Sequence, residues 1–334
     1  EILRAPPDFA LAGATQSDGL TFIHKQAGDV EVYFVANLQP APSETAVTFR
    51  VSGKRPERWD AMTGEITRIV HYRAQKDGIE IPLRLAPWES TFVIFSPGAS
   101  EAHIVKTDLA EVRTAGDGVF TGIAASNGRF AAEIREGQGA RSFSVKVTDL
   151  PEPLPVAGRW KLTLEGVRFP RIEKEITQLA SWTESADTRY LSGSGLYEIE
   201  FDLPAEYLRK ETELLLDLGA VGDVAEVKLN DQAVGVRWMQ PYRFDVTRTA
   251  RAGKNRLQVI ITNALHNHVA GMKEPPGLPA ELAGRYGGQA RKYVLGEAVF
   301  KARDQRLQTL PVSGLLGPVR IVAWRVALIG RLRK

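Results

Sequence analysis

The chain of 334 residues contains no cysteine, which excludes disulfide bonds and thiolate metal sites. No apolar run approaches the ~20 residues of a membrane-spanning helix, so we expect no membrane partner. The formal net charge of +3 is too small to indicate a nucleic-acid partner. Residues 1–7 lack the basic and apolar regions of a secretory signal peptide. We expect a solvated basic tail at the end of the chain, formed by Arg325, Arg331, Arg333 and Lys334.

Motifs of self-contained catalysis are also missing. The chain has no Gly-x-Ser-x-Gly elbow, no phosphate-binding loop, no His-Glu-x-x-His pair and no EF-hand loop. No segment alternates strand and helix patterns over the ~200 residues that a (β/α)₈ barrel needs. Hydrophobic and charged contents of 43% and 25% are those of an ordinary globular protein, and the length indicates two or three domains.

The chain does contain a long succession of short strand patterns. Between residues 197 and 203, apolar residues alternate with Glu198, Glu200 and Asp202, which is typical of a half-buried strand. Some seven such patterns before residue 97 predict a β-sandwich. The pair Asn127-Gly128 lies between two further strand patterns and predicts a hairpin turn.

We therefore predict an all-β chain that begins with a β-sandwich. Five motifs further along the chain indicate a jelly roll after it. Helix is expected only over 205–209 and within 264–308, a long loop that suggests a function. The predicted parts are a β-sandwich domain over 1–97, a short β segment with a Pro-rich linker over 98–155, and a jelly-roll domain over 156–334.

The jelly-roll prediction comes from five short motifs in a fixed order. They are Tyr197-x-x-x-Phe201-x-Leu203-Pro204, Val227-x-Leu229-Asn230, Pro241-Tyr242-x-x-Asp245-Val246-Thr247, Gly253-x-Asn255-x-Leu257-x-Val259 and Thr262-Asn263. This succession resembles the galactose-binding-like jelly roll that is the sugar-binding domain of family 2 glycoside hydrolases. The resemblance implies a β-sandwich followed by a galactose-binding-like jelly roll as the fold. Earlier segments, such as Phe22-Ile23-His24-Lys25 and Arg58-Trp59-Asp60-Ala61, resemble the part that follows the catalytic barrel in family 106, the α-L-rhamnosidases.

The resemblance implies a carbohydrate-binding accessory region of an α-L-rhamnosidase-like glycoside hydrolase that lacks the catalytic barrel. It implies a rhamnose-containing or other plant or bacterial glycan as partner, a catalytic glycosidase domain as a second partner, and a periplasmic or secreted location. No cofactor is required. Galactose-binding-like modules often hold a structural calcium, for which the candidate ligands are Asp217, Asp223 and Asp231, although their spacing is not distinctive.

The candidate sugar-binding residues lie in loops that the jelly-roll order places at strand ends. Sugars are bound by an aromatic ring against their C–H face and by planar polar groups at their hydroxyls. On the alternative interpretation, Trp238 and Tyr242 pack beneath residues 243–247. Trp182 lies in a pattern that indicates the core. The candidates are Trp238, Tyr242, Asn263, His266, Asn267 and His268.

Two other functions stay open. Carboxylates two residues apart on one strand face are ~7 Å apart, as in paired glycosidase carboxylates, so Glu198 and Glu200 suit a small stand-alone glycoside hydrolase with its active site on the jelly roll. A solvated strand face is the simpler interpretation. His266 and His268 could bind zinc but lack a nearby carboxylate. The remaining alternative is a structural spacer without a ligand.

Overall fold

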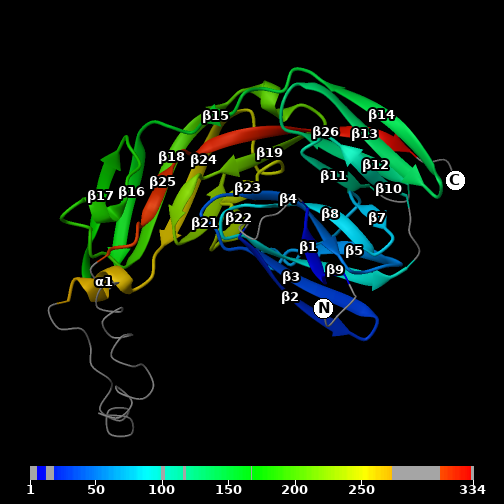
Figure 1. The fold of residues 1–334 in the computed structure, drawn as a ribbon. Coiled ribbons are helices and arrows are strands. Elements are labelled where there is room, and N and C mark those ends of the chain that lie inside the picture. The colour runs from blue at the N-terminus through cyan, green and yellow to red at the C-terminus, as the bar shows by residue number, and fades with distance from the viewer. Residues whose placement is uncertain are drawn as a thin grey trace, which may run out of the picture.

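The computed structural model describes residues 6–12, 19–98, 102–115, 118–166, 168–272 and 309–331 (Figure 1). Strands make up most of this part, which confirms the predicted all-β fold. None of the described helices is long and apolar enough to cross a membrane. The described helices are the 3₁₀ turns η1 Trp182–Glu184 and η2 Ala205–Leu208, and the α-helix α1 His266–Ala270. The sequence predicted helix at η2 and α1 but not at η1.

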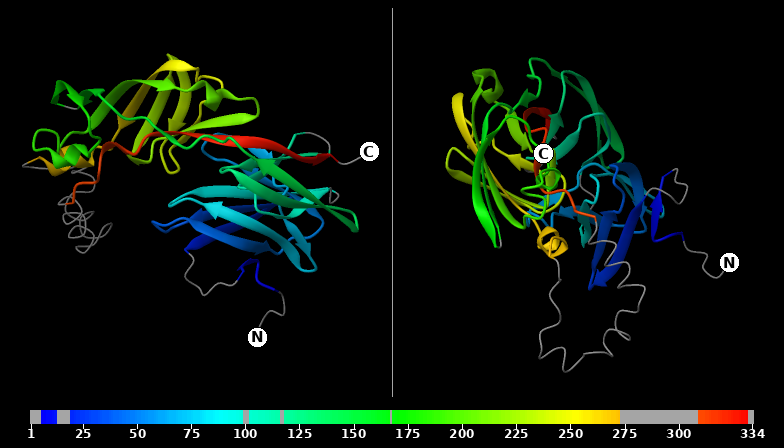
Figure 2. Two further views of the ribbon diagram at one scale, coloured as in Figure 1. Left: turned by 90° about the horizontal axis from the view of Figure 1, so that it is seen from above. Right: turned by 90° about the vertical axis from the view of Figure 1, so that its left-hand side faces the viewer.

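The first part of the chain is a sandwich of two antiparallel sheets, drawn in blue and cyan in Figure 2. The strand orders are β1-β4-β8-β7 and β2-β3-β9-β5-β6. Alternate residues of both sheets, such as Tyr33, Val47 and Phe95, point inward and form one apolar core. The strands are β1 Phe9–Leu11, β2 Leu20–Ala27, β3 Val30–Asn37, β4 Ser43–Phe49, β5 Lys54–Trp59, β6 Ile66–Arg68, β7 Arg73–Gln75, β8 Gly78–Leu85 and β9 Ser90–Pro97.

The next strands divide between two sheets. β10 His103–Thr107, β13 Gly128–Glu136 and β14 Gly139–Val147 form one sheet, whereas β11 Glu111–Thr114 and β12 Val119–Ala124 join another. The hairpin predicted at Asn127-Gly128 is therefore wrong, because β12 and β13 do not pair. The Asn127 side chain is bound elsewhere. Its Nδ2 donates to the Leu150 carbonyl at 3.0 Å, and its Oδ1 accepts from the Leu150 N–H at 2.8 Å.

Two larger sheets form the jelly roll, with strand orders β17-β16-β18-β24-β21-β22 and β11-β12-β26-β19-β23. In β18 the alternation predicted from the sequence is present, with Tyr197 and Ile199 in the core and Glu200 exposed. The strands are β15 Leu154–Pro155, β16 Trp160–Gly166, β17 Phe169–Ile176, β18 Gly193–Leu203, β19 Thr212–Asp217, β20 Ala220–Gly222, β21 Val224–Leu229, β22 Gln232–Arg237, β23 Arg243–Asp245, β24 Gly253–Thr262, β25 Gly314–Gly317 and β26 Arg320–Arg331.

The last strand, β26, connects the segment 98–155 to the jelly roll. It runs antiparallel beside β12, β15 and β19, and Figure 1 shows it in red, running toward the C-terminus. Arg325 and Arg331 were predicted in a solvated basic tail; both lie in this strand, and Arg331 is exposed. Arg325 donates from Nη1 to the Lys210 carbonyl at 3.1 Å. Arg333 and Lys334 lie outside the described residues.

The sandwich is joined to the rest of the chain through the segment before β7. The Ile104 N–H donates to the Val70 carbonyl at 2.7 Å, and the Tyr72 N–H donates to the Ile104 carbonyl at 3.0 Å. The Tyr72 ring stacks on His103, with the ring centroids 4.1 Å apart. Val70 belongs to a second, larger apolar core, in which residues of 98–155 and of the jelly roll pack together.

Candidate carbohydrate-binding site

The predicted site residues gather at one end of the sheet that contains β21, β22 and β24. Val224 pairs with Thr262 there, and Ala225 pairs with both Ile261 and Arg237. The chain after β22 and the chain after β24 therefore leave the sheet at the same end. The jelly-roll order in the sequence predicted this convergence of loops.

Asp223 connects the two loops. Its φ of 113° lies in the region that favours glycine. Its backbone carbonyl accepts a hydrogen bond from the Tyr242 hydroxyl, and its Oδ2 accepts one from the Ala264 N–H at 2.8 Å. Asp223 therefore holds the Tyr242 side chain and the chain at Ala264 at the same end of the sheet.

The two aromatic candidates differ in exposure. Tyr242 is 5% exposed and belongs to the large apolar core, as in the packing interpretation of its motif. Burial raises the pKa of its hydroxyl to about 12, and the nearby charge of Asp223 adds to this effect. Trp238 is 52% exposed, so its ring is accessible to a ligand. Trp182 is buried and donates from Nε1 to the Tyr197 hydroxyl at 2.7 Å, which confirms its predicted place in the core.

The amide candidates are held by backbone and serine groups. Asn263 Oδ1 accepts from the Gly193 N–H at 2.9 Å, and its Nδ2 donates to the Leu191 carbonyl at 2.9 Å. Asn267 is 1% exposed, and its Nδ2 donates to Ser313 Oγ at 3.0 Å. Through these bonds, Asn263 is attached to β18, and Asn267 attaches α1 to the chain before β25.

Both histidine candidates lie in α1. His266 Nε2 lies 3.2 Å from the Thr309 carbonyl, and the His268 backbone N–H donates to Ser192 Oγ at 3.0 Å. Within the part of the chain that the structure describes, no group of three or more histidine, aspartate or glutamate side chains is placed to hold a metal ion.

The candidate calcium ligands each have other partners. Asp217 accepts from Arg243 Nε at 3.1 Å, and Asp231 lies 3.2 Å from Arg256 Nη1. Asp223 binds the Ala264 N–H, as described above. These three carboxylates therefore serve three separate sets of contacts.

The carboxylates of β18 lie on the outer face of the sheet. Glu198 accepts from Arg256 Nη2 at 2.7 Å and from Gln258 Nε2 at 2.9 Å. Burial raises the pKa of Glu198, but these hydrogen bonds and the charges of Arg256 and Lys161 outweigh it and hold the pKa below its usual range. Glu200 and Asp202 are exposed. A glycosidase acid needs a raised pKa, so Glu198 lacks the electrostatic setting of that acid.

Comparison with known proteins gives two family matches. Residues 1–74 match the model of family 106 glycoside hydrolases, α-L-rhamnosidase, and residues 179–296 match the galactose-binding-like domain of family 2 glycoside hydrolases. The predicted resemblance is confirmed. The chain is therefore related to glycoside hydrolases.

Two individual proteins are similar to the chain. The structure of a rhamnosidase from Novosphingobium sp. PP1Y is 26% identical and has a TM-score of 0.62, and the match covers 95% of this chain and 25% of that one. A putative beta-glucuronidase of Formosa agariphila is 32% identical over 198 residues, which covers 54% of this chain and 16% of that protein. The chain thus spans a quarter or less of the length of these relatives.

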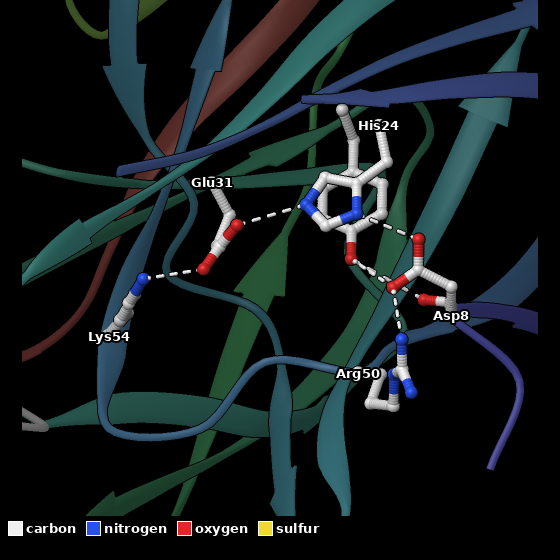
Figure 3. A network of polar contacts seen from close by, with 6 residues as sticks. Asp8, His24, Glu31, Arg50 and Lys54 are labelled. Atoms are coloured by element: carbon white, nitrogen blue, oxygen red, sulfur yellow. Dashed lines mark hydrogen bonds and ion pairs between the residues drawn. The ribbon is translucent and has the colours of Figure 1, made fainter. Parts of the chain in front are cut away.

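A polar network in the rhamnosidase-like sandwich was missed by the sequence analysis (Figure 3). His24 Nδ1 lies 2.7 Å from Asp8 Oδ2, and His24 Nε2 lies 3.0 Å from Glu31 Oε2. The imidazole also stacks on the Tyr33 ring, with the centroids 4.0 Å apart. The signal available in the sequence was the alternation of β2, which places Phe22 and His24 on one face.

The network continues to two cations. Arg50 Nη2 lies 3.3 Å from Asp8 Oδ1, and Lys54 Nζ lies 2.8 Å from Glu31 Oε1. Ionised carboxylates only accept hydrogen bonds, so both contacts of the His24 ring are hydrogen bonds when the ring is an imidazolium ion. Since both ring nitrogens are engaged, the network joins the residue before β1 to β2 and β3.

Proposed function

We propose that this chain is the carbohydrate-binding accessory region of an α-L-rhamnosidase-like glycoside hydrolase. The observation that supports this most directly is the match of 95% of the chain to a quarter of a rhamnosidase. No parallel barrel of strands and helices occurs among the described residues, so the proposal assigns bond cleavage to another domain.

The jelly roll supplies the sugar contact. A pyranose ring has an apolar C–H face, which packs against an exposed indole. Trp238 offers such a ring at the end of the sheet, whereas Tyr242 and Asn267 are buried. The proposed contact therefore relies on Trp238. His266 and His268 of α1 border the same end of the sheet.

Glycan binding by the purified chain tests the proposal. We expect measurable binding of an oligosaccharide ending in α-L-rhamnose by calorimetry, and no hydrolysis of p-nitrophenyl α-L-rhamnoside. Trp238→Ala should abolish binding and leave the melting temperature close to that of the wild type, because the ring is exposed. Trp88→Ala is the matched control, since Trp88 is also 52% exposed but lies in the sandwich, and it should bind normally.

Two results would contradict the proposal. A chain that binds none of the rhamnose-containing glycans tested would favour a structural spacer. Hydrolysis that is lost in Glu198→Gln or Glu200→Gln would instead show that the jelly roll carries an active site of its own.

A further inference from the structure

A cavity of about 390 Å³ lies where the end of β14, the chain after η2 and the second half of β26 meet. Small-molecule sites in proteins have volumes of roughly 300–1,000 Å³, so this cavity can hold a ligand the size of a sugar. Three cations and two carboxylates border it, and we call it the β14–β26 cavity. The charged residues of its lining are Lys146, Asp149, Arg209, Glu211 and Arg325.

The β14–β26 cavity is separate from the candidate site at Trp238. Trp238 follows Arg237, which is in register through β21 and β24 with Gly195, near the beginning of β18. Arg209 follows η2, which comes after the other end of β18. The eleven residues of β18 span roughly 30 Å. The two sites therefore lie toward opposite ends of this strand.

Two guanidinium groups at the cavity are each held by one backbone carbonyl. Arg209 donates from Nη1 to the Asp149 carbonyl at 3.3 Å, and Arg325 donates from Nη1 to the Lys210 carbonyl at 3.1 Å. An arginine has five N–H donors. In the described part of the chain, neither residue has a buried side-chain nitrogen without a partner. The donors that remain are therefore accessible to a ligand.

These cations have no anion of their own. Across the described ranges, Lys146, Arg209 and Arg325 form no ion pair with a carboxylate. Arg325 lies on the face of β26 that also carries the buried residues Ile321 and Ala323, and it is itself only partly exposed. A partly buried charge is screened less by salt than an exposed one, so an anionic ligand would be attracted here.

The opposite chemistry is also present at the cavity. Asp149 and Glu211 have φ values of 60° and 66°, a conformation that is uncommon in residues other than glycine. The backbone of Glu211 is fixed, because its carbonyl accepts from the Val326 N–H at 2.8 Å. Ionised carboxylates only accept hydrogen bonds, so these two side chains suit the hydroxyl groups of a ligand.

We propose that the β14–β26 cavity binds a hexuronate, with the sugar carboxylate held by Arg209 and Arg325 and the sugar hydroxyls donating to Asp149 and Glu211. Guanidinium and carboxylate groups form strong, charge-assisted hydrogen bonds. A neutral sugar would leave the cations without an anion, and a simple anion would give the two carboxylates no donor. Leu328, which is 55% exposed, adds apolar surface for a C–H face of the sugar.

This inference goes beyond the proposed function, because the site does not use Trp238. Calorimetric titration of the full chain with D-glucuronate at low ionic strength tests it, and D-glucose is the matched ligand without a carboxylate. We expect glucuronate to bind and glucose to bind roughly tenfold more weakly or less, as for loss of a hydrogen bond to a charged group.

Arg209→Gln is the main variant, because Arg209 is exposed and the substitution should leave the fold intact. It should weaken glucuronate binding roughly tenfold. Arg325→Gln should weaken it as well, with its melting temperature measured alongside. Arg159→Gln is the matched control, since Arg159 is an exposed arginine outside the cavity lining, and it should bind glucuronate as the wild type does.

The outcomes separate this site from the rhamnose site. A wild-type chain that does not bind glucuronate, or that binds glucose as tightly, would overturn the inference, and so would unchanged binding in both Arg209→Gln and Arg325→Gln. Acetate that binds as tightly as glucuronate would overturn the sugar assignment. Trp238→Ala should retain glucuronate binding, and Arg209→Gln should retain binding of the oligosaccharide ending in α-L-rhamnose, so either proposal can fail without the other.

Discussion

At the scale of single residues, the His24 network leads us to expect that the protein is less stable at acid pH. Burial raises the pKa of Asp8, but hydrogen bonds from His24, Tyr33 and Arg50 outweigh it and hold the pKa below its usual range. The hydrogen bond from Lys54 is the largest influence on Glu31 and lowers its pKa, with His24 adding to the effect. A lowered pKa in the folded state means that protonation favours the unfolded chain.

The sign of the pH effect follows from these directions. The stabilisation is fully present above the unfolded carboxylate pKa of about 4 and is lost as the pH falls through the lower folded values. Asp8→Asn should therefore lower the melting temperature at pH 7 and flatten its fall between pH 4 and 2. Asp202→Asn is the control, because Asp202 is exposed, and it should retain the wild-type pH profile. Equal slopes in both variants would exclude the network as a source of acid sensitivity.

The candidate residues show what a sequence can predict about a site and what it cannot. Motif order placed Trp238 and His266 at one end of a sheet, because strand register follows from alternation and turns. The same motifs could not separate Trp238 from Tyr242, since an aromatic residue is used in cores and in sugar sites alike. Burial depends on the neighbouring loop, and Asp223 supplies the contact that holds the Tyr242 hydroxyl inside.

At the scale of elements, local patterns predicted strands well and their partners poorly. The alternation in β18 was sufficient to predict its inward and outward faces. The pair Asn127-Gly128 is a strong local turn signal, yet β12 pairs with β26, far along the sequence. Strand partners depend on such long-range contacts, which a local turn signal does not report. The basic residues of β26 similarly suggested a solvated tail, although Ile321 and Ala323 in this strand are buried.

The central position of β26 leads to a testable difference between two of its residues. Ile321 is fully buried and lies in the part of β26 that pairs with β19 and β15, whereas Leu328 is exposed in the part that pairs with β12. Ile321→Ala should reduce the free energy of unfolding by about 2–5 kcal/mol, because it leaves a cavity in the large core. Leu328→Ala should change it by about 0.5 kcal/mol or less. Urea denaturation measures both free energies of unfolding. A loss for Ile321→Ala as small as that for Leu328→Ala would show that the Ile321 side chain does not stabilise the core.

At the scale of the whole molecule, the chain has two apolar cores and one extended junction. The sandwich core includes Tyr33, Phe49 and Phe95, and among the described residues it takes in none from beyond 97. The larger core combines residues of 98–155 with the jelly roll, and it also takes in Val70.

The two cores also make the predicted boundary at residue 97 testable. A fragment of residues 1–97 keeps both sheets of the sandwich and its complete core, so we expect it to unfold cooperatively in urea. It should be less stable than the sandwich in the full chain, because Val70 loses its apolar surroundings and Tyr72 loses its stacking partner His103. Adding Tyr72→Ala to both proteins provides the control. The substitution should cost more in the full chain, where the ring contacts His103, than in the fragment. A fragment without cooperative unfolding would mean that the sandwich does not fold as an independent unit. An equal effect of Tyr72→Ala in both proteins would mean that stacking on His103 does not stabilise the full chain.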